Sequence, residues 1–394
     1  MPSSTTTSSS AGFKLAARLE QVGFSDIVQI RNKVMELKTQ GRSVHQFEGG
    51  EPFLNTPDHI KEAMTQALRD NKTRYAPSSG IMELRTAIAE KVVSRNQIPA
   101  TVEDVVVVNG GMQGLFGAFQ ATLDPGDEVL MFSPYWTPIK DLVAYCQAVP
   151  VFVPTSDARK HGLDATLAQY ATSRTRAIYF NTPQNPGGVV FTRAEAMAVA
   201  KFAQERNLIV IADEAYEDLV YDSEHVSIAS LEGMFERTIT SFTLSKSYSM
   251  TGWRVGYVVA KEPWMTGIRK TTLYSTNGVS TPSQWAALVA IKTPVELFAQ
   301  IREQYRLRRN LLINGLNALG FPCEMPHGAF YAFPDVSQID SDSRQAAAKL
   351  LDTAQVATVP GIVFGPHGEG HCRFSFSTSP ENIQAGLDAM KKNL

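Results

Sequence analysis

The stretch Ser241-Phe-Thr-Leu-Ser-Lys246-Ser-Tyr-Ser-Met-Thr-Gly252-Trp-Arg254-Val-Gly-Tyr257 overlaps two runs of strand-forming residues. The first run covers residues 238–244 and the second covers residues 255–260, and both are rich in β-branched and apolar side chains. This pattern predicts two strands joined by a short connection. The connection carries a lysine, several hydroxyl groups and an arginine, so polar chemistry is expected where the first strand ends.

Lys246 follows the first run directly, and Arg254 comes eight residues later. Burial and a neighbouring cation both lower the pKa of a lysine and favour its neutral, nucleophilic form. The hydroxyls of Thr243 and Ser245, with the Arg254 guanidinium, suit a phosphate dianion. The stretch therefore suits an amine that forms a Schiff base beside a bound phosphate. Taken alone, the same lysine also fits a surface position in a turn, so the rest of the chain has to decide.

Further apolar runs alternate with longer helical patterns through the middle of the chain. Besides the two runs above, strands are predicted at 105–108, 128–132, 149–153, 177–180 and 208–212. Most of these runs are apolar on both faces, which is typical of a parallel sheet covered by helices on both sides. We therefore expect an α/β fold with a doubly wound, mostly parallel sheet.

Two capping boxes predict where helices begin. Thr192-x-x-Glu195 predicts a helix that runs to Glu205. Thr293-Pro-x-Glu296 predicts a long helix that runs to Leu319, with Gly320 as its stop. Short strands at 329–333, 357–359 and 373–376, with a helix at about 343–353, predict a smaller α+β unit after the long helix. The expected organisation has four parts: a disordered tail at 1–12, an N-terminal segment at 13–48 packed on the small domain, a large domain at 49–290 and a small domain at 291–394.

Composition narrows the class of protein. The chain has 394 residues, 43% hydrophobic and 19% charged, which is ordinary for a soluble globular protein of two domains. A net charge of −2 gives no basic field for a nucleic acid, and no apolar run is long enough to span a membrane. The three cysteines and seven histidines show no metal-type spacing, so we expect no metal, reduced thiols and a cytoplasmic location. The Ser/Thr-rich start lacks the apolar core of a signal peptide, and a transit peptide is left open.

Polar motifs follow the predicted strands repeatedly. They are Asn109-Gly-Gly111, Pro134-Tyr-Trp136, Asn181-Thr-Pro-Gln-Asn185-Pro-Gly-Gly188, Asp213-Glu-Ala-Tyr216 and Lys246. In a doubly wound sheet, ligands bind at the carboxyl ends of the strands. These motifs are therefore expected to meet at one site.

Jointly, these motifs resemble those of the class I/II aminotransferases, which are fold type I pyridoxal-phosphate enzymes of the aspartate aminotransferase superfamily. The likeness is to the I-gamma subgroup with Ser-Lys-x-x-x-Met-Thr-Gly-Trp-Arg, and it runs from about Leu15 to the end of the chain. It rests on the order and spacing of the lysine block, Asn-x-Pro-x-Asn-Pro-x-Gly, Asp-Glu-x-Tyr and a late arginine. The resemblance implies the cofactor pyridoxal 5'-phosphate.

By this resemblance, Lys246 holds the cofactor as a Schiff base and then moves a proton on the substrate. Asp213 would keep the pyridine nitrogen protonated, and Asn185 and Tyr216 would donate hydrogen bonds to the phenolic oxygen. Trp136 would stack on the ring, with Tyr135 as the competing aromatic residue. The phosphate would be bound by groups from two regions of the chain: Gly111, Met112, Thr243, Ser245 and Arg254.

The resemblance also implies partners. Tyr75 matches a tyrosine that reaches the phosphate of the neighbouring subunit, which implies a homodimer with shared active sites. Arg373 matches the arginine that binds the substrate α-carboxylate bidentately, a geometry that lysine cannot reproduce. Gly50 and Asn185 would border the same carboxylate.

At one position the sequence departs from the pattern of family members that prefer dicarboxylate substrates. Members that prefer dicarboxylates often carry a lysine where this chain has Met112. A preference for aspartate by that route is therefore doubtful, although a distant arginine from the partner subunit could substitute for the lysine. Met112 with Trp136 indicates an apolar or aromatic substrate side chain. The Glu48 carboxylate would suit a cationic or polar substrate side chain at the mouth of the site. It would equally suit an ion pair with a structural arginine.

Three functions are compatible with the motifs. The leading hypothesis is a ping-pong aminotransferase that acts on an amino acid and a 2-oxo acid. Elimination, cyclisation, decarboxylation or oxidation on the same scaffold would use the same Lys246, so the motifs barely separate these reactions. A non-catalytic sensor is disfavoured because the residues before Gly50 are too few for a DNA-binding domain with a linker.

Overall fold

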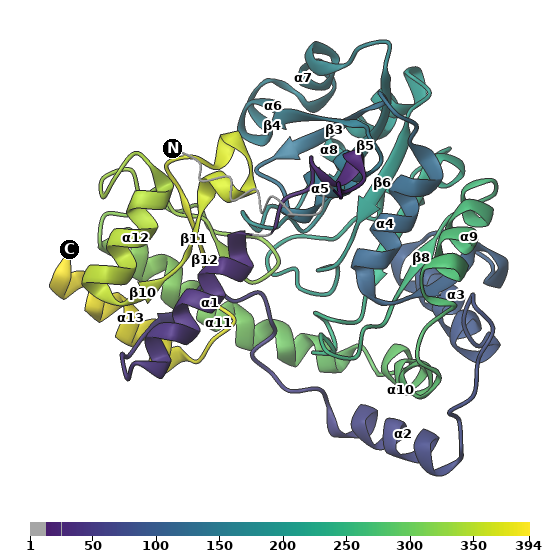
Figure 1. Ribbon diagram of the computed structural model, residues 1–394, viewed down its shortest axis with the longest axis horizontal. Helices are drawn as coiled ribbons and strands as arrows, with labels where there is room; N and C mark the ends of the chain where they lie inside the picture. Colours follow the sequence, from purple (N-terminus) through teal and green to yellow (C-terminus); the bar gives the residue numbers. More distant parts are fainter. Residues whose placement is uncertain (1–12, 25) are drawn as a thin grey trace.

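The computed structural model describes residues 13–24 and 26–394, so the tail predicted to be disordered lies outside the described residues. Its largest element is a seven-stranded sheet in the order β2-β8-β7-β6-β5-β3-β4 (Figure 1). The strands are β2 (Val105–Val108), β3 (Glu128–Ser133), β4 (Val149–Pro154), β5 (Thr175–Asn181), β6 (Ile209–Asp213), β7 (Thr238–Thr243) and β8 (Gly256–Val259). Each lies on a predicted strand, which confirms the α/β fold with a mostly parallel sheet.

One strand of this sheet runs against the others. β8 pairs antiparallel with both β2 and β7, whereas the remaining neighbours are parallel. β7 and β8 follow each other in the chain, and an antiparallel pair can be joined by a loop without a crossover helix. That loop carries Lys246 and Arg254. Apolar residues on both faces predict burial but not strand direction, so the reversal could not be seen in the sequence.

Helices cover both faces of the sheet. One face is covered by α4 (Gly110–Thr122), α5 (Pro138–Tyr145) and α9 (Trp264–Thr276), and the other by α3 (Met82–Asn96), α6 (Thr155–His161), α7 (Leu163–Tyr170) and α8 (Arg193–Glu205). Successive valines of β2 alternate between these layers: Val106 and Val108 pack with α4 and α9, and Val105 and Val107 pack with α3. This two-sided burial explains the continuous apolar runs.

The two predicted helix starts have different outcomes. Thr192 caps α8 as predicted, because Glu195 N donates to Thr192 Oγ1 over 3.2 Å and Thr192 N donates to Glu195 Oε2 over 2.7 Å. The prediction that a capping box at Thr293 begins a helix is wrong. α11 (Glu296–Ala318) begins after Val295, and the Thr293 hydroxyl donates to Val289 O in the turn that follows α10 (Thr281–Ile291). Gly320 follows α11 with a φ of +85°, as its predicted stop requires.

A second group of elements contains α11, α12 (Ser343–Ala354), α13 (Pro380–Asn393) and the sheet β11-β12-β9. Its strands are β9 (Tyr331–Ala332), β11 (Val359–Pro360) and β12 (Cys372–Ser375). The predicted run at 357–359 is divided in two, because residues 356–357 form β10, which pairs with β1 (His45–Gln46).

The N-terminal segment reaches both groups of elements (Figure 1). In α1 (Asp26–Thr39), Val34 and Leu37 pack against Ala357 and Leu351, whereas the short helix at 17–19 lies against α5. α2 (Asp58–Arg69) packs on α10. None of the helices in the described part of the chain is long and apolar enough to cross a membrane.

Candidate active site

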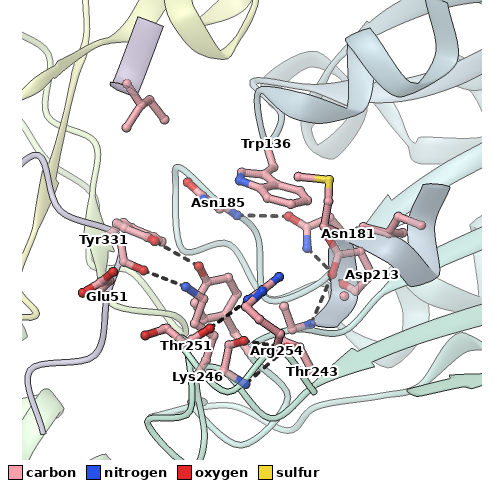
Figure 2. Close-up of a pocket in the computed structure, with 18 of the residues that line it drawn as sticks. Glu51, Trp136, Asn181, Asn185, Asp213, Thr243, Lys246, Thr251, Arg254 and Tyr331 are labelled. Atoms are coloured by element: carbon pink, nitrogen blue, oxygen red, sulfur yellow. Dashed lines mark hydrogen bonds between the residues drawn. The ribbon is translucent and has the colours of Figure 1, made fainter. Parts of the chain in front are cut away.

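A cavity of about 440 Å³ opens at the carboxyl ends of the parallel strands (Figure 2). The residues predicted for the site that line it are Gly50, Gly111, Met112, Trp136, Asn185, Asp213, Tyr216, Thr243, Ser245, Lys246, Arg254 and Arg373. They come from segments that span most of the chain, so the structure brings together what the motifs predicted to meet. Tyr75 is the predicted residue that does not line this cavity.

The strand register sets the floor of the cavity. Asn181 and Asp213 are opposite each other at the ends of β5 and β6, and Ser241 of β7 is opposite Asp213. Asn181 Nδ2 donates to Asp213 O over 2.9 Å, and Asn181 Oδ1 accepts a hydrogen bond from Asn185 N over 3.1 Å. The side chain of Asn181 therefore fixes the loop that carries Asn185 to the strand that carries Asp213.

Lys246 lies on this floor, in the loop after β7. Its Nζ donates to Gly50 O over 2.6 Å and lies 5.9 Å from the centre of the Tyr216 ring. Burial, reinforced by the Arg373 cation, lowers the pKa of Lys246 to about 8. The amine can therefore lose its proton near neutral pH, as the sequence predicted.

Asp213 is a buried carboxylate with few partners. Oδ2 accepts a hydrogen bond from the Tyr179 hydroxyl over 2.7 Å, and Oδ1 accepts one from Ala215 N over 3.3 Å. Burial raises the pKa of Asp213 to about 6, and the hydrogen bond from Tyr179 opposes this rise. A cation placed against Asp213 would stabilise the ionised form, which is what a protonated ring nitrogen would supply.

The start of α4 and the loop after β7 form a cup for an anion. The Asn109 side chain does not cap α4 in the described structure; its Nδ2 donates to Thr276 Oγ1 over 3.0 Å and to Gly278 O over 3.2 Å. The first-turn N–H groups of α4 are thus left for a ligand. Thr243 Oγ1 donates to Ser245 Oγ over 2.9 Å beside them.

Arg254 completes the cup. Its Nη2 would lie 2.6 Å from a Cβ placed on Gly110, whose φ of +76° also favours glycine, so any other residue there would displace the guanidinium. Free helix N–H groups, two hydroxyls and a guanidinium are the donors that a phosphate requires. With the amine of Lys246 in the same cavity, the residues present fit a phosphorylated aldehyde.

Packing distinguishes Tyr135 from Trp136, the two aromatic residues that were candidates to stack on the cofactor ring. Tyr135 is buried and stacks on Phe152, with ring centres 5.1 Å apart and ring planes 8° apart. Trp136 is half-buried and lines the cavity. Trp136 is therefore the aromatic residue that can face a ligand, as expected.

Arg373 lies at the opposite wall and is 2% exposed. Its Nη1 donates to Asn185 Oδ1 over 3.1 Å, and its Nη2 donates to Glu48 O over 2.8 Å. Its Nε has no hydrogen-bond partner among the described residues. Glu48 is itself buried and holds Arg373 through its backbone, so its side chain does not face the cavity mouth. The carboxylate that lines the cavity is Glu51.

Sequence reasoning missed several residues that line the cavity. They are Ile27, Glu51, Leu115, Asn181, Ala215, Thr251, Gly252 and Tyr331. Asn181 stands at the start of the asparagine–proline motif, a signal that could have found it. Ile27 and Tyr331 belong to apolar stretches of a helix and a strand, where the sequence gives no sign of which residue meets a ligand.

Tyr75 lies elsewhere on the molecule. Its side chain is 93% exposed and borders a surface hollow with Arg74 and Gly278. Within the described chain it touches neither the cup nor Lys246. Its expected contact with the phosphate of a second subunit stays a prediction.

A buried polar cluster lies behind Asp213. Glu214 Oε2 accepts hydrogen bonds from Ser227 Oγ over 2.6 Å and from His225 Nε2 over 2.8 Å, and Lys91 pairs with Glu217. One ligand atom each from Glu214, Glu217 and His225 lie within 4.8 Å of one another. The ammonium of Lys91 already pairs with Glu217 and the His225 ring already bonds Glu214, so we interpret the group as a structural polar cluster.

The geometry above fits one class of enzyme: an α/β protein with a buried lysine amine beside groups that suit a phosphate. Similarity to known proteins defines the family. The family model for aminotransferase class I and II matches residues 43–390. An aspartate/prephenate aminotransferase of Thermus thermophilus is 39% identical over 384 residues, which cover 96% of this chain and 98% of the relative. The aromatic-amino-acid aminotransferase 2 of Thermococcus litoralis is 37% identical over 385 residues, with coverage of 96% and 98%.

A solved structure supports the same family assignment. Aspartate aminotransferase from Thermus thermophilus with maleate matches with a TM-score of 0.92 at 38% identity, over 97% of this chain and 100% of that chain. The chain therefore belongs to the class I and II aminotransferases. This confirms the family that the four motifs indicated, and it favours amino-group transfer over the elimination, cyclisation and oxidation alternatives.

Proposed function

We propose that the protein moves an amino group from an amino acid to a 2-oxo acid by a ping-pong mechanism, with pyridoxal 5'-phosphate held at Lys246. The observation that carries this proposal is the meeting of Lys246, Asp213, the anion cup and Arg373 in one cavity. The bound cofactor supplies an electron sink for bond cleavage at the substrate α-carbon. The protein has to attach it, orient it and move protons.

Each residue has a defined task in this proposal. The Arg373 guanidinium binds the substrate α-carboxylate through its free edge. Lys246 Nζ, with its pKa lowered to about 8, takes a proton from the substrate α-carbon and returns it during the cycle. Asn185 Oδ1 already accepts a hydrogen bond from Arg373, so Asn185 Nδ2 remains to donate to the cofactor's phenolic oxygen. The Tyr216 hydroxyl would donate to the same oxygen, and the Asp213 carboxylate would pair with the ring nitrogen.

The side-chain end of the cavity supports an apolar or aromatic donor. Ile27, Met112, Leu115 and Trp136 supply apolar atoms there. The cations that line the cavity within the described chain are Lys246, Arg254 and Arg373, and all three have other tasks. A second carboxylate on the substrate would therefore lack a partner in this chain and would be costly to bury.

We also propose a homodimer in the cytoplasm. Tyr75 is exposed, as a residue that serves another subunit would be before assembly. The thiols of Cys146, Cys323 and Cys372 are free, in agreement with a reducing compartment. Light scattering at micromolar concentration tests the dimer; a monomer that is fully active would contradict the shared site.

Absorbance spectroscopy tests the reaction. We expect a visible band on the purified holoenzyme that an amino acid bleaches and a 2-oxo acid restores. Ammonia, hydrogen peroxide or carbon dioxide formed in stoichiometric amounts without an acceptor would contradict amino transfer.

A donor panel with one 2-oxo acid acceptor tests the side-chain preference. Phenylalanine and leucine should react faster than aspartate. Met112→Lys should raise kcat/KM for aspartate about tenfold relative to phenylalanine, because it adds a cation to the wall. Faster reaction of the unmodified enzyme with aspartate would contradict the proposed preference.

A further inference from the structure

Tyr331 of β9 lies between the two halves of the candidate site. Its side chain is 1% exposed and lines the cavity. Its hydroxyl is 2.9 Å from the Tyr216 hydroxyl, and its ring centre is 4.3 Å from Arg373 Cζ. One side chain thus contacts the expected partner of the cofactor's phenolic oxygen and the expected partner of the substrate carboxylate.

The surroundings hold Tyr331 in this place. A Cβ on Gly50 would lie 3.3 Å from the Tyr331 hydroxyl, and Gly50 O accepts the hydrogen bond from Lys246 Nζ. The ring also packs on Phe330, with centres 4.8 Å apart. The hydroxyl therefore has a fixed position among Gly50, Tyr216 and Arg373, with little room to turn away.

We propose that Tyr331 is a positioning residue whose hydroxyl directs the Tyr216 proton towards the cofactor and whose ring orients the Arg373 guanidinium for the substrate carboxylate. This inference rests on the proposed function. Each hydroxyl has one proton to donate. If Tyr216 donates to the phenolic oxygen of the cofactor, the hydrogen bond between the two tyrosines must be donated by Tyr331. A donated bond polarises Tyr216 and makes it a stronger donor in turn.

The ring acts separately from the hydroxyl. Arg373 lies over the faces of Tyr331 and of Phe364, whose ring centre is 5.0 Å from Cζ. Such contacts attract a guanidinium and hold its plane. With both Nη atoms donating to Asn185 and Glu48, the edge that carries Nε remains for a ligand.

The charges near the pair keep Tyr331 able to donate. Burial raises the pKa of Tyr331 and the Arg373 cation opposes this rise, and burial also raises the pKa of Tyr216. The other charged groups that act on Tyr216 are Asp213, which disfavours its phenolate, and Lys246, whose Nζ lies over its ring. Both tyrosines therefore keep their protons at neutral pH.

Tyr305 provides a matched control. It is also 1% exposed and stacks on the same Phe330, with ring centres 5.6 Å apart. Its hydroxyl accepts a hydrogen bond from Phe53 N over 3.1 Å and does not line the cavity. Tyr305→Phe therefore removes a buried hydroxyl from the same cluster without touching Tyr216 or Arg373.

The hydroxyl is tested by titrating the visible absorption band of the holoenzyme with pH, without substrate. In Tyr331→Phe the Tyr216 donor is weaker, so the phenolate of the cofactor is less stabilised and the midpoint should rise by about half a pH unit. Tyr305→Phe should titrate like the unmodified enzyme. Coincident curves for Tyr331→Phe and the unmodified enzyme, or equal shifts in both variants, would overturn this half of the proposal.

The ring is tested by calorimetric binding of 3-phenylpropanoate, an unreactive carboxylate, to the holoenzyme. Tyr331→Phe keeps the ring and should bind within twofold of the unmodified enzyme, whereas Tyr331→Leu should bind about fivefold more weakly. Equal binding by Tyr331→Leu would overturn the role of the ring. An unmodified enzyme with no visible band that an amino acid bleaches would instead reject the proposed function, so the two failures are distinguishable.

Discussion

Two sides of the cavity are built in different ways. The cofactor floor, formed by Asn181, Asp213 and Lys246, comes from neighbouring parallel strands and the loop after β7. The substrate wall, formed by Ile27, Gly50, Tyr331 and Arg373, comes from α1, from the loop after β1 and from the sheet β11-β12-β9. One side is fixed by hydrogen-bonded register within a single sheet, and the other by packing between segments far apart in the chain.

This difference assigns chemistry and selectivity to different parts of the molecule. In the proposed reaction, the floor would carry the groups that bind the cofactor and move protons, and strand register leaves them little freedom. In the same proposal, the wall would carry the groups that meet the substrate. Changes in the floor should therefore lower the rate of the chemical step, whereas changes in the wall should mainly alter substrate binding.

The largest expected effect comes from the floor. Lys246→Ala should lower kcat by about 10⁴-fold, because it removes the amine that we propose holds the cofactor and moves the proton. Steady-state kinetics at saturating donor and acceptor measures this. Lys261→Ala is the control, because Lys261 pairs with Asp104 away from the cavity and should keep normal activity. Activity above a tenth of normal in Lys246→Ala would contradict the role of this lysine.

The next effect comes from the wall. Arg373→Lys keeps the charge but loses the bidentate fork, so kcat/KM should fall about 10²-fold, mostly through KM. Arg309→Lys is a matched control, because Arg309 is 3% exposed and pairs with Asp222 outside the cavity. An equal loss in both variants would show that burial of an arginine, not recognition of a carboxylate, is what matters.

The same division explains what the sequence could predict. Asp213 and Lys246 follow runs of buried strand residues, and the strand-end rule places such residues together whatever the loops do. Tyr331 lies in an apolar run at 329–333, where neither composition nor alternation separates the residue that faces the cavity from those that face the core. Thr293 shows the limit for local signals: its capping box is intact in the sequence, yet the turn after α10 takes its hydroxyl.

The pH dependence of the stability of the cofactor-free protein tests whether burial in the floor lowers the pKa of Lys246. The pKa of Lys246 falls from 10.5 in the unfolded chain to about 8 in the fold. Below pH 8 both states are protonated, and between 8 and 10.5 only the unfolded chain binds the proton, so stability rises with pH across this window. Across this window, the free energy of unfolding of the unmodified protein should rise by about 1–2 kcal/mol relative to that of Lys246→Met. The full pKa shift of Lys246 would give a larger rise, but the amine borders a cavity that is open to solvent.

Urea unfolding of both proteins at pH 7.5, 9 and 10.5 measures this difference. Taking the difference between the two proteins cancels the other groups that titrate in the same range. A difference that stays flat, or that falls as pH rises, would show that the folded protein does not disfavour the charged amine. The lysine would then need its cofactor, and not its burial, to become nucleophilic.

The smallest expected effect tests whether the N-terminal segment belongs to the wall. Ile27 of α1 lines the cavity, whereas its neighbour Val28 is 56% exposed. Ile27→Ala removes apolar contact with a large substrate side chain, so KM for phenylalanine should rise roughly threefold to tenfold with kcat unchanged. KM for alanine as donor should not change, because its methyl group is too short to reach this wall. Val28→Ala should leave both unchanged; an equal rise for alanine and phenylalanine in Ile27→Ala would mean that α1 supports the fold of the site and does not touch the substrate.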